Sequence, residues 1–348
     1  MTGARAGGGR MMKAQFYQGA RRFVPGTAPV PAAGPGEALL RVRRVGIYGT
    51  DLHIYEGHLD ARVGKGRVIG HETFAEVVEA PAGSAVRAGD RVVINPVMSC
   101  GECRACKMGA SYVCYNLKVR GVDVDGGMRE LYPVPADRLL KVPDTLSDDH
   151  AALIEPVAVA THDVNRAQVK PGDAVLVFGG GPIGALIAMV SRHRGARVAV
   201  AEINPFRVDM LKGLGLEVVG PDRDVMKFVP EWTNGEGVDV AFEVTGNPKA
   251  VRLMTDVVRV WGTISIVAIH SEPMPVNLLA MFSRELNMHA SRLYTWDAWE
   301  EAIRLGATGA VTLGPLVSKK IPLEALGEGM EQALKGGPVM KVLIDLTQ

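Results

Sequence analysis

The stretch AVLVFGGGPIG, residues 174–184, decides the fold of this chain. A short β-branched and aromatic run is followed directly by the pattern G-x-G-x-x-G and then by the apolar, helix-like run 185–192. In such a unit the first glycine allows a tight turn, the second lets the backbone approach a pyrophosphate, and the third lets the helix pack on the strand. The helix N-terminus then faces the anion. The stretch therefore predicts a dinucleotide site at Gly179, Gly181, Pro182, Ile183 and Gly184.

An acidic residue ends the next strand-like run, 197–201. This residue, Glu202, lies about 20 residues beyond the last glycine, where the motif places the carboxylate that binds the ribose hydroxyls. A carboxylate there repels a 2′-phosphate, so we expect NAD to be preferred over NADP. Arg207 lies five residues after Glu202, where an arginine could bind the 2′-phosphate of NADP. The alternative interpretation of Arg207 is a solvated residue on a helix.

Strand-like and helix-length runs alternate from residue 174 onward, which predicts a doubly wound parallel sheet and an α/β fold class. The expected strands are 174–178, 197–201, 217–219, 238–243 and 263–267. Residues 13–142 consist instead of short alternating runs separated by Pro-Gly, Gly-Asp and Ala-Gly turns, which predicts a β-rich domain. We also expect helices over 151–164 and 296–306.

Composition favours a small-molecule partner. The 348 residues carry a formal net charge of +1, so no global field attracts nucleic acid or an anionic membrane. No apolar run approaches the roughly 20 residues that span a bilayer. The Gly- and Ala-rich residues 1–10 have no apolar core of a secretory signal, so we expect a cytoplasmic protein.

The cysteines all lie in one short loop with the spacing C-x2-C-x2-C-x7-C: Cys100, Cys103, Cys106 and Cys114. Closely spaced thiolates on a turning backbone bind zinc tetrahedrally, and four sulfurs leave no open position for a substrate. We therefore expect a structural zinc site. An iron–sulfur cluster, which uses similar spacings, is the second interpretation.

Taken together, five segments resemble the zinc-dependent medium-chain alcohol dehydrogenases over nearly the whole chain. They are residues 45–53, Gly70-His71-Glu72, the cysteine loop, Glu155-Pro156, and the glycine turn with Glu202. Glu155-Pro156 resembles the polyol, threonine and butanediol dehydrogenase branch, and residues 95–127 resemble sugar-acid dehydrogenases.

The resemblance implies the domain organisation. Residues 13–155 and 292–348 would form a GroES-like catalytic domain, residues 156–291 a Rossmann NAD-binding domain, and residues 1–12 a disordered extension. It also implies hydride transfer between a secondary alcohol (a polyol, sugar acid or amino alcohol) and the nicotinamide, with zinc polarising the substrate oxygen. The partner would be a small alcohol or ketone, and we expect a homodimer or homotetramer.

The resemblance also implies site residues. His71, Glu72 and Glu155 match the catalytic-zinc region, with Asp51 orienting His71, while Thr50 and His53 match a proton relay. Thr245 and Ala268 follow strands at the cofactor edge of the sheet, where they would line the nicotinamide. Lys341 resembles a basic residue near the pyrophosphate, with a solvated surface lysine as the alternative. Candidate pocket liners are Tyr55, His58, Trp296 and Trp299, although aromatic residues on helices more often belong to the core.

One position departs from the family pattern. The family has a zinc-binding cysteine in Gly-Ile-Cys-Gly, and this chain has Tyr48 there. His71, Glu72 and Glu155 could suffice with water, Tyr48 could bind as a phenolate, or the catalytic metal could be weak or absent. We favour a retained but weakened site. The competing hypotheses are a non-catalytic NAD(H)-binding homologue and a metal-independent reductase in which Tyr48 donates the proton.

Overall fold

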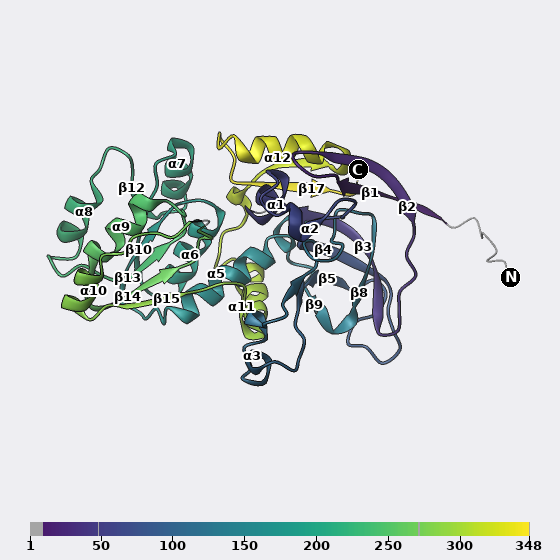
Figure 1. Ribbon diagram of the computed structural model, residues 1–348, viewed down its shortest axis with the longest axis horizontal. Helices are drawn as coiled ribbons and strands as arrows, with labels where there is room; N and C mark the ends of the chain where they lie inside the picture. Colours follow the sequence, from purple (N-terminus) through teal and green to yellow (C-terminus); the bar gives the residue numbers. More distant parts are fainter. Residues whose placement is uncertain (1–9, 48, 271, 348) are drawn as a thin grey trace. The chain divides into compact units, whose positions relative to one another are not determined.

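The computed structural model describes residues 10–47, 49–270 and 272–347, which form two compact units (Figure 1). Unit 1 comprises the chain up to Glu155 and again from Val317, and unit 2 comprises Pro156–Leu316. The first boundary coincides with the one we expected after residue 155. The second lies at residue 316 instead of 291.

Side-chain contacts explain why residues 292–316 group with unit 2. Ser291 Oγ donates to Asp163 Oδ1 at 2.5 Å, and Arg194 forms an ion pair of 2.7 Å with Glu301. Trp299 is completely buried and meets Tyr294 edge to face. These contacts join the segment to α5 and α6, which belong wholly or mostly to unit 2.

A six-stranded, all-parallel sheet forms the centre of unit 2, in the order β12-β11-β10-β13-β14-β15. The strands are β10 (Ala174–Phe178), β11 (Arg197–Ala201), β12 (Glu217–Val219), β13 (Val238–Glu243), β14 (Val258–Ile266) and β15 (Asn287–Ala290). In chain order within the unit this is 3-2-1-4-5-6, the doubly wound order of dinucleotide-binding sheets. This parallel sheet with its connecting helices agrees with the predicted α/β class.

One helix precedes the first strand of this sheet, one lies between each two consecutive strands, and one follows the last strand. They are α5 (Ile154–Arg166), which begins at the unit boundary, α6 (Pro182–His193), α7 (Pro205–Gly213), α8 (Val225–Trp232), α9 (Pro248–Val257), α10 (Leu278–Arg284) and α11 (Trp296–Ala307). Several begin with recognisable capping chemistry. Asn204 and Asn247 accept backbone N–H bonds at the starts of α7 and α9, each followed by a proline at the first helical position.

A mostly antiparallel sheet organises unit 1, in the order β16-β17-β3-β4-β5-β9, with β8 also paired to β3 and with β16 and β17 parallel to each other. Its members are β3 (Glu37–Gly46), β4 (Glu72–Glu79), β5 (Arg91–Ile94), β8 (Leu131–Pro135), β9 (Leu139–Lys141), β16 (Val317–Pro322) and β17 (Lys341–Asp345). Smaller elements are β1 (Met11–Tyr17), β2 (Phe23–Pro29), β6 (Val97–Met98), β7 (Lys118–Val119), α1 (Gly49–Tyr55), α2 (Asp60–Val63), α3 (Arg104–Lys107), α4 (Asp148–Ala151) and α12 (Leu326–Leu334). The last segment of the chain thus supplies two strands of this sheet.

The predicted N-terminal extension was too long by two residues. Strand β1 starts at Met11, and the Met12 side chain is buried against Leu39 and Leu131. This burial explains the pairing of β1 with β2. Residues 1–9 lie outside the described residues.

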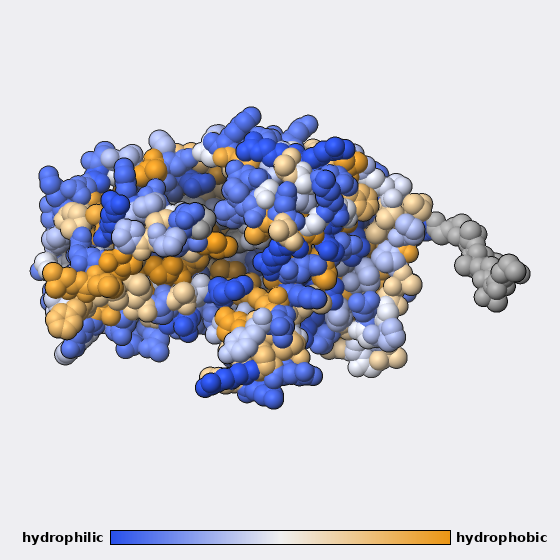
Figure 2. Space-filling model, viewed as in Figure 1, coloured by the Kyte–Doolittle hydropathy of each residue, from blue (hydrophilic) through white to orange (hydrophobic). Residues whose placement is uncertain are grey.

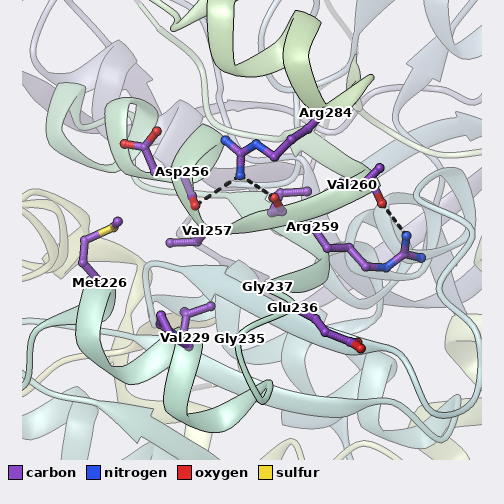
Figure 3. Close-up of a pocket in the computed structure, with 12 residues that line it drawn as sticks. Met226, Val229, Gly235, Glu236, Gly237, Asp256, Val257, Arg259, Val260 and Arg284 are labelled. Carbon is purple, nitrogen blue, oxygen red and sulfur yellow. Dashed lines mark hydrogen bonds between the residues drawn. The ribbon is translucent and has the colours of Figure 1, made fainter.

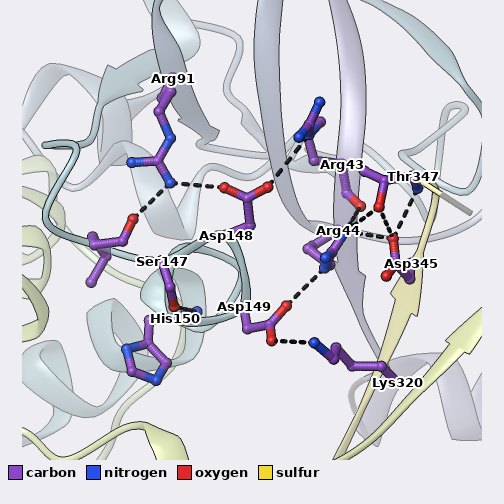
Figure 4. A network of polar contacts seen from close by, with 11 residues as sticks. Arg43, Arg44, Arg91, Ser147, Asp148, Asp149, His150, Lys320, Asp345 and Thr347 are labelled. Carbon is purple, nitrogen blue, oxygen red and sulfur yellow. Dashed lines mark hydrogen bonds and ion pairs between the residues drawn. The ribbon is translucent and has the colours of Figure 1, made fainter.

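A network of ion pairs fixes α4 to the sheet of unit 1 (Figure 4). Arg44 on β3 contacts Asp149 of α4 at 2.8 Å and Asp345 of β17 at 2.5 Å, and Lys320 of β16 contacts Asp149 at 2.8 Å. Burial raises the pKa of Asp149, but Lys320 and Arg44 lower it more, so the net shift is downward. The network anchors α4, a few residues before Glu155.

Within the described parts of the chain, none of the helices combines the length and the apolar character that crossing a membrane requires.

Candidate active site and zinc sites

The glycine turn joins β10 to α6 at the carboxyl edge of the parallel sheet. Gly179 has a φ of +100°, a conformation that side chains rarely adopt. A Cβ on Gly184 would lie 1.8 Å from the Gly179 carbonyl oxygen, so only glycine permits this helix–strand approach. Around Gly181 the nearest atom to such a Cβ is Arg207 Nη1 at 3.6 Å, which leaves the backbone accessible. Pro182 and Ile183 open α6, whose N-terminal N–H groups suit a pyrophosphate.

Glu202 lies beside this turn and is 6% exposed. Its Oε2 accepts a hydrogen bond of 2.8 Å from Gly180 N, and its Oε1 accepts from Ile203 N and Asn204 N at 2.7 and 2.8 Å. Arg207 Nη1 is 3.8 Å from Glu202 Oε2. Glu202 is therefore held in place before any ribose arrives, and Arg207 is drawn towards it.

Thr245 and Ala268 lie at the same carboxyl edge, after β13 and β14. Sequence reasoning missed the group that organises them, the fully buried Glu243. Its Oε1 accepts from Thr245 N, Thr245 Oγ1 and Gly246 N at 2.8, 2.5 and 3.0 Å, and its Oε2 lies 2.9 Å from His270 Nε2. Ala268 N donates to the Glu243 carbonyl at 3.1 Å. One carboxylate thus fixes both loops.

The hollow drawn in Figure 3 lies at the opposite, amino edge of the sheet, between the loop before β13 and the start of β14. Arg284 Nη1 donates to the carbonyls of Val258 and Asp256 at 2.7 and 3.3 Å, and Arg259 Nη1 donates to the carbonyl of Val260 at 2.6 Å. Because cofactors of doubly wound sheets bind at the carboxyl edge, this hollow is not the cofactor site.

The four cysteines of unit 1 converge, with all ligand atoms within 4.8 Å of one another. Sγ–Sγ separations within the cluster are 3.5 Å for Cys103–Cys106, 3.8 Å for Cys103–Cys114 and 3.4 Å for Cys100–Cys114. Tetrahedral zinc with Zn–S bonds of about 2.3 Å requires sulfurs about 3.8 Å apart. The cluster therefore fits one zinc ion, and it is too tight to enclose the several atoms of an iron–sulfur cluster.

Backbone N–H groups prepare this cluster for a metal. Backbone N–H donors at Glu102 and Cys103 lower the pKa of the Cys100 thiol to about 6. The pKa of the Cys103 thiol is also lowered, mainly by the hydrogen bond from the Cys106 N–H. Burial and neighbouring sulfurs raise the pKa of Cys106 to about 12. A bound cation deprotonates such thiols, because thiolates are the zinc ligands.

A second group of buried ionisable side chains surrounds His71. Asp51 of α1 is fully buried, with its Oδ2 at 3.7 Å from His71 Nδ1. Glu72 on β4 is also fully buried, and Lys341 of β17, 1% exposed at its side chain, forms an ion pair with Glu72 Oε1. Burial lowers the pKa of His71, but Asp51, Glu155 and Glu72 raise it more, to about 9. Lys341 thus meets Glu72, a contact that sequence spacing gave no way to foresee.

This group fits a cation by charge and donor type. Three carboxylates, Asp51, Glu72 and Glu155, are each no more than 4% exposed, with Lys341 and His71 as their basic neighbours. Glu72 Oε2 is buried and has no hydrogen-bond partner among the described residues. Buried carboxylates are costly unless opposite charge offsets them.

The ligand atoms of His71, Glu72 and Glu155 are not gathered, however. Across the described ranges, the cysteine cluster and the trio His53, Glu56 and His58 bring three or more such atoms within 4.8 Å. A zinc ion bound by all three residues would require their side chains to move closer together. Tyr48, the expected replacement for the cysteine, lies outside the described residues.

Helix α1 carries the other predicted catalytic residues. Asp51 turns inward, Thr50 is partly exposed, and His53 lies in the last turn. His53 Nδ1 is 3.3 Å from Nδ1 of His58, a residue that we expected only as a pocket liner.

Two expected pocket liners are core residues instead. Tyr55 is 4% exposed, stacks on Phe23 and donates its hydroxyl to Glu331 at 3.0 Å. Trp299 is fully buried. Trp296 remains 39% exposed. Packing against neighbouring elements buries the first two, as is usual for aromatic side chains on helices.

Known protein families match both units. Residues 34–144 match the alcohol dehydrogenase GroES-like domain, and residues 182–308 match the zinc-binding dehydrogenase domain. The two matches cover the β-rich sheet before α4 and the parallel sheet from α6 onward.

Individual relatives align over nearly the full length. The chain is 39% identical over 341 residues to 2-dehydro-3-deoxy-L-galactonate 5-dehydrogenase of Pseudoalteromonas atlantica, covering 96% of this chain and 98% of that protein. It is 34% identical over 325 residues to L-threonine 3-dehydrogenase of Pyrococcus horikoshii, covering 91% and 93%. The crystal structure of 2R,3R-butanediol dehydrogenase from Bacillus subtilis gives a TM-score of 0.88 at 31% identity, covering 96% and 99%.

The fold, the four-cysteine site and these matches define a zinc-binding dehydrogenase. The chain belongs to the zinc-dependent medium-chain alcohol dehydrogenase family, in its polyol and threonine dehydrogenase branch. It is an oxidoreductase that transfers hydride between a secondary alcohol and a nicotinamide, with NAD and zinc as cofactors. These predictions are confirmed, and the roles of individual residues remain predictions.

Proposed function

We propose that the substrate is a sugar acid or a related polyhydroxy compound, oxidised at a secondary hydroxyl. The observation that carries this proposal is the 39% identity, over 96% of the chain, to a dehydrogenase named for a deoxy sugar acid. Relatives that act on an amino alcohol or a diol align at lower identity. Residues 95–127, which include the whole cysteine loop, favour the same branch.

NAD would be bound by the carboxyl edge of the parallel sheet. The N–H groups around Gly181 would bind the pyrophosphate, and Glu202 would accept hydrogen bonds from the ribose hydroxyls. Glu202 pairs with Arg207 at 3.8 Å, which holds the guanidinium close to the carboxylate and favours NAD over NADP. Thr245 and Ala268, held by Glu243, would line the nicotinamide.

The proton of the alcohol would leave through α1. Thr50 would accept a hydrogen bond from the substrate hydroxyl as that group loses its proton, and His53, in the last turn of α1, would carry the proton towards solvent. Asp51 would hold His71 in one orientation through Nδ1, as carboxylates commonly do for metal-binding histidines.

Two zinc ions would be held by different residues. Cys100, Cys103, Cys106 and Cys114 would bind the structural ion, and reduced thiols there are consistent with a cytoplasmic enzyme. His71 and Glu155, joined by Glu72, would hold a weakened catalytic ion. When bound, that ion supplies Lewis-acid polarisation of the substrate oxygen.

A second candidate is metal-independent oxidoreduction with Tyr48 as the proton donor. The replacement of the cysteine by Tyr48 and the Lys341–Glu72 pair favour it. Chelation of the labile metal separates the two candidates, because a metal-independent enzyme would keep its full activity.

A substrate panel tests the primary proposal. The zinc-loaded protein would be assayed for NADH formation with sugar acids, polyols, threonine and 2,3-butanediol. We expect the highest kcat/KM with a sugar acid. A higher kcat/KM for threonine or butanediol would contradict the proposed substrate class.

We propose that the enzyme is a homodimer formed through unit 2. Five large apolar residues, Val260, Trp261, Leu278, Leu279 and Phe282, are 53 to 83% exposed. Figure 2 shows an apolar band where Figure 1 places α10, β14 and β15. Strand β15 is also the edge of its sheet, and an open edge beside an apolar patch favours pairing with a second copy.

A further inference from the structure

The end of α1 carries a cluster of metal-binding side chains that the proposed reaction does not use as ligands. His53, Glu56 and His58 bring one ligand atom each to within 4.8 Å of one another. His53 Nδ1 and His58 Nδ1 are 3.3 Å apart, and His58 Nδ1 is 3.7 Å from Glu56 Oε2. Three residues within a single turn and its following loop thus converge on one point.

These separations match a coordinated transition-metal ion. Two ligands on a tetrahedral ion with bonds of about 2.1 Å lie about 3.4 Å apart. Two imidazoles and one carboxylate are the ligand set of many zinc sites with an open position. Imidazole nitrogen favours zinc and copper, and it disfavours magnesium and calcium, which prefer oxygen.

The surroundings make the site accessible and reversible. The His58 side chain is 60% exposed and that of Glu56 is 30% exposed. Arg21 lies 3.6 Å from the other carboxylate oxygen of Glu56, so the carboxylate is oriented with Oε2 towards His58. An exposed three-ligand site of this kind exchanges its ion with the medium more readily than the four-cysteine site does.

We propose that His53, Glu56 and His58 form an additional metal site that takes Zn²⁺ and that its occupancy inhibits the dehydrogenase. The inhibitory part rests on the proposed role of His53 in moving the substrate proton. A metal ion on Nδ1 fixes the imidazole ring and removes that nitrogen from proton transfer. Zinc would then have two effects on the enzyme. It would fill the structural and catalytic sites, and in excess it would bind at the additional site and slow the reaction.

The test is equilibrium dialysis of the zinc-loaded protein against buffered Zn²⁺, with metal counted by mass spectrometry and activity measured on the same samples. The variants are His58→Gln and Glu56→Gln, with His193→Gln on the exposed surface of unit 2 as the matched control. We expect one additional Zn²⁺ per chain in the wild type and the control. Loss of a ligand should weaken its binding by about tenfold or more.

Activity provides the second readout. In buffer without added zinc, Glu56→Gln should have wild-type activity, and it should need about tenfold more zinc for half-inhibition. The electron paramagnetic resonance spectrum of added Cu²⁺ should show two imidazole nitrogens in the wild type and one in His58→Gln. Mg²⁺ at the same concentration should neither bind there nor inhibit.

Three results would overturn the proposal. They are the absence of an additional ion in the wild type, equal binding in His58→Gln and wild type, and an additional ion that leaves activity unchanged. The dialysis and the Cu²⁺ spectrum do not depend on turnover. If the protein oxidised no alcohol, they would still report on the metal site, so failure of the proposed function is distinguishable.

Discussion

At position 48 this chain has a tyrosine, where the family pattern has a zinc-binding cysteine. Replacing it, Tyr48→Cys, should raise the affinity of the catalytic zinc by about 10- to 100-fold, because a charged sulfur ligand joins His71 and Glu155. Zinc would be counted after dialysis against a chelator, with Tyr48→Phe as the control for loss of the hydroxyl alone. Equal zinc retention in Tyr48→Cys and wild type would contradict a site weakened at this position.

Glu202 and Arg207 together set the choice of cofactor. Glu202→Ala removes the charge that repels a 2′-phosphate and releases Arg207 to bind it. We expect the ratio of kcat/KM for NAD to that for NADP to fall by about tenfold or more, since like-charge repulsion across an interface costs several kcal/mol. The double variant with Arg207→Ala should gain less activity with NADP. An unchanged ratio in the single variant would show that Glu202 does not discriminate.

Local spacing predicted the backbone geometry of the glycine turn, but it did not predict which side chains contact the candidate site residues. Gly179, Gly184 and Glu202 were predictable because their roles follow from a strand, a turn and a helix that are contiguous in sequence. Lys341 was linked to the pyrophosphate, but it pairs with Glu72, which lies on another strand of the same sheet. Glu243 was missed as an organising group because its partners, Thr245 and His270, are brought together only by folding.

Helix α5 contains a buried carboxyl that makes stability depend on pH. Burial raises the pKa of Asp163 to about 7, opposed by the hydrogen bond from Ser291. The pKa of an aspartate in the unfolded chain is about 3.9. Between about pH 4 and pH 7 the folded state therefore holds a proton that the unfolded state has lost. The contribution to stability is present below about pH 4 and is lost as the pH rises through about 7.

Asp163→Asn imitates the protonated acid and should remove this pH dependence. Between pH 5 and 8 the wild type should lose stability relative to the variant by a few kcal/mol, on the order of 1.4 kcal/mol per unit of pKa shift. Urea unfolding at both pH values measures the difference, and His193→Gln serves as a neutral control. Parallel stability curves for wild type and Asp163→Asn would contradict a raised pKa.

Elements buried on both faces were predicted best. The bounds of β10, β11, β12 and β13 agree with prediction, because strands of a parallel sheet are nearly continuous apolar runs. Strand β14 begins at Val258, five residues before the predicted start, through a stretch in which Val260 and Trp261 are exposed. The predicted helix 151–164 divides into α4 and α5, which the pattern of apolar residues did not reveal.

The proposed dimer assigns a role to the exposed apolar residues of unit 2, which would form its interface. Phe282 is 83% exposed on α10, so Phe282→Asp should cost little in folding. A buried charge in a dimer interface would weaken association strongly. Light scattering coupled to size exclusion should give a dimer for the wild type and monomer for the variant. A monomeric wild type at micromolar concentration would contradict the proposed assembly.

The central claim, hydride transfer from a secondary alcohol to NAD, is tested most directly by isotope transfer. The zinc-loaded protein would be incubated with NAD and a sugar acid deuterated at the carbon that bears the reacting hydroxyl, and the nicotinamide would be analysed by mass spectrometry. We expect one deuterium in each NADH formed and slower turnover than with the undeuterated substrate. NAD that binds to the protein but acquires no deuterium from any substrate of the panel would contradict it.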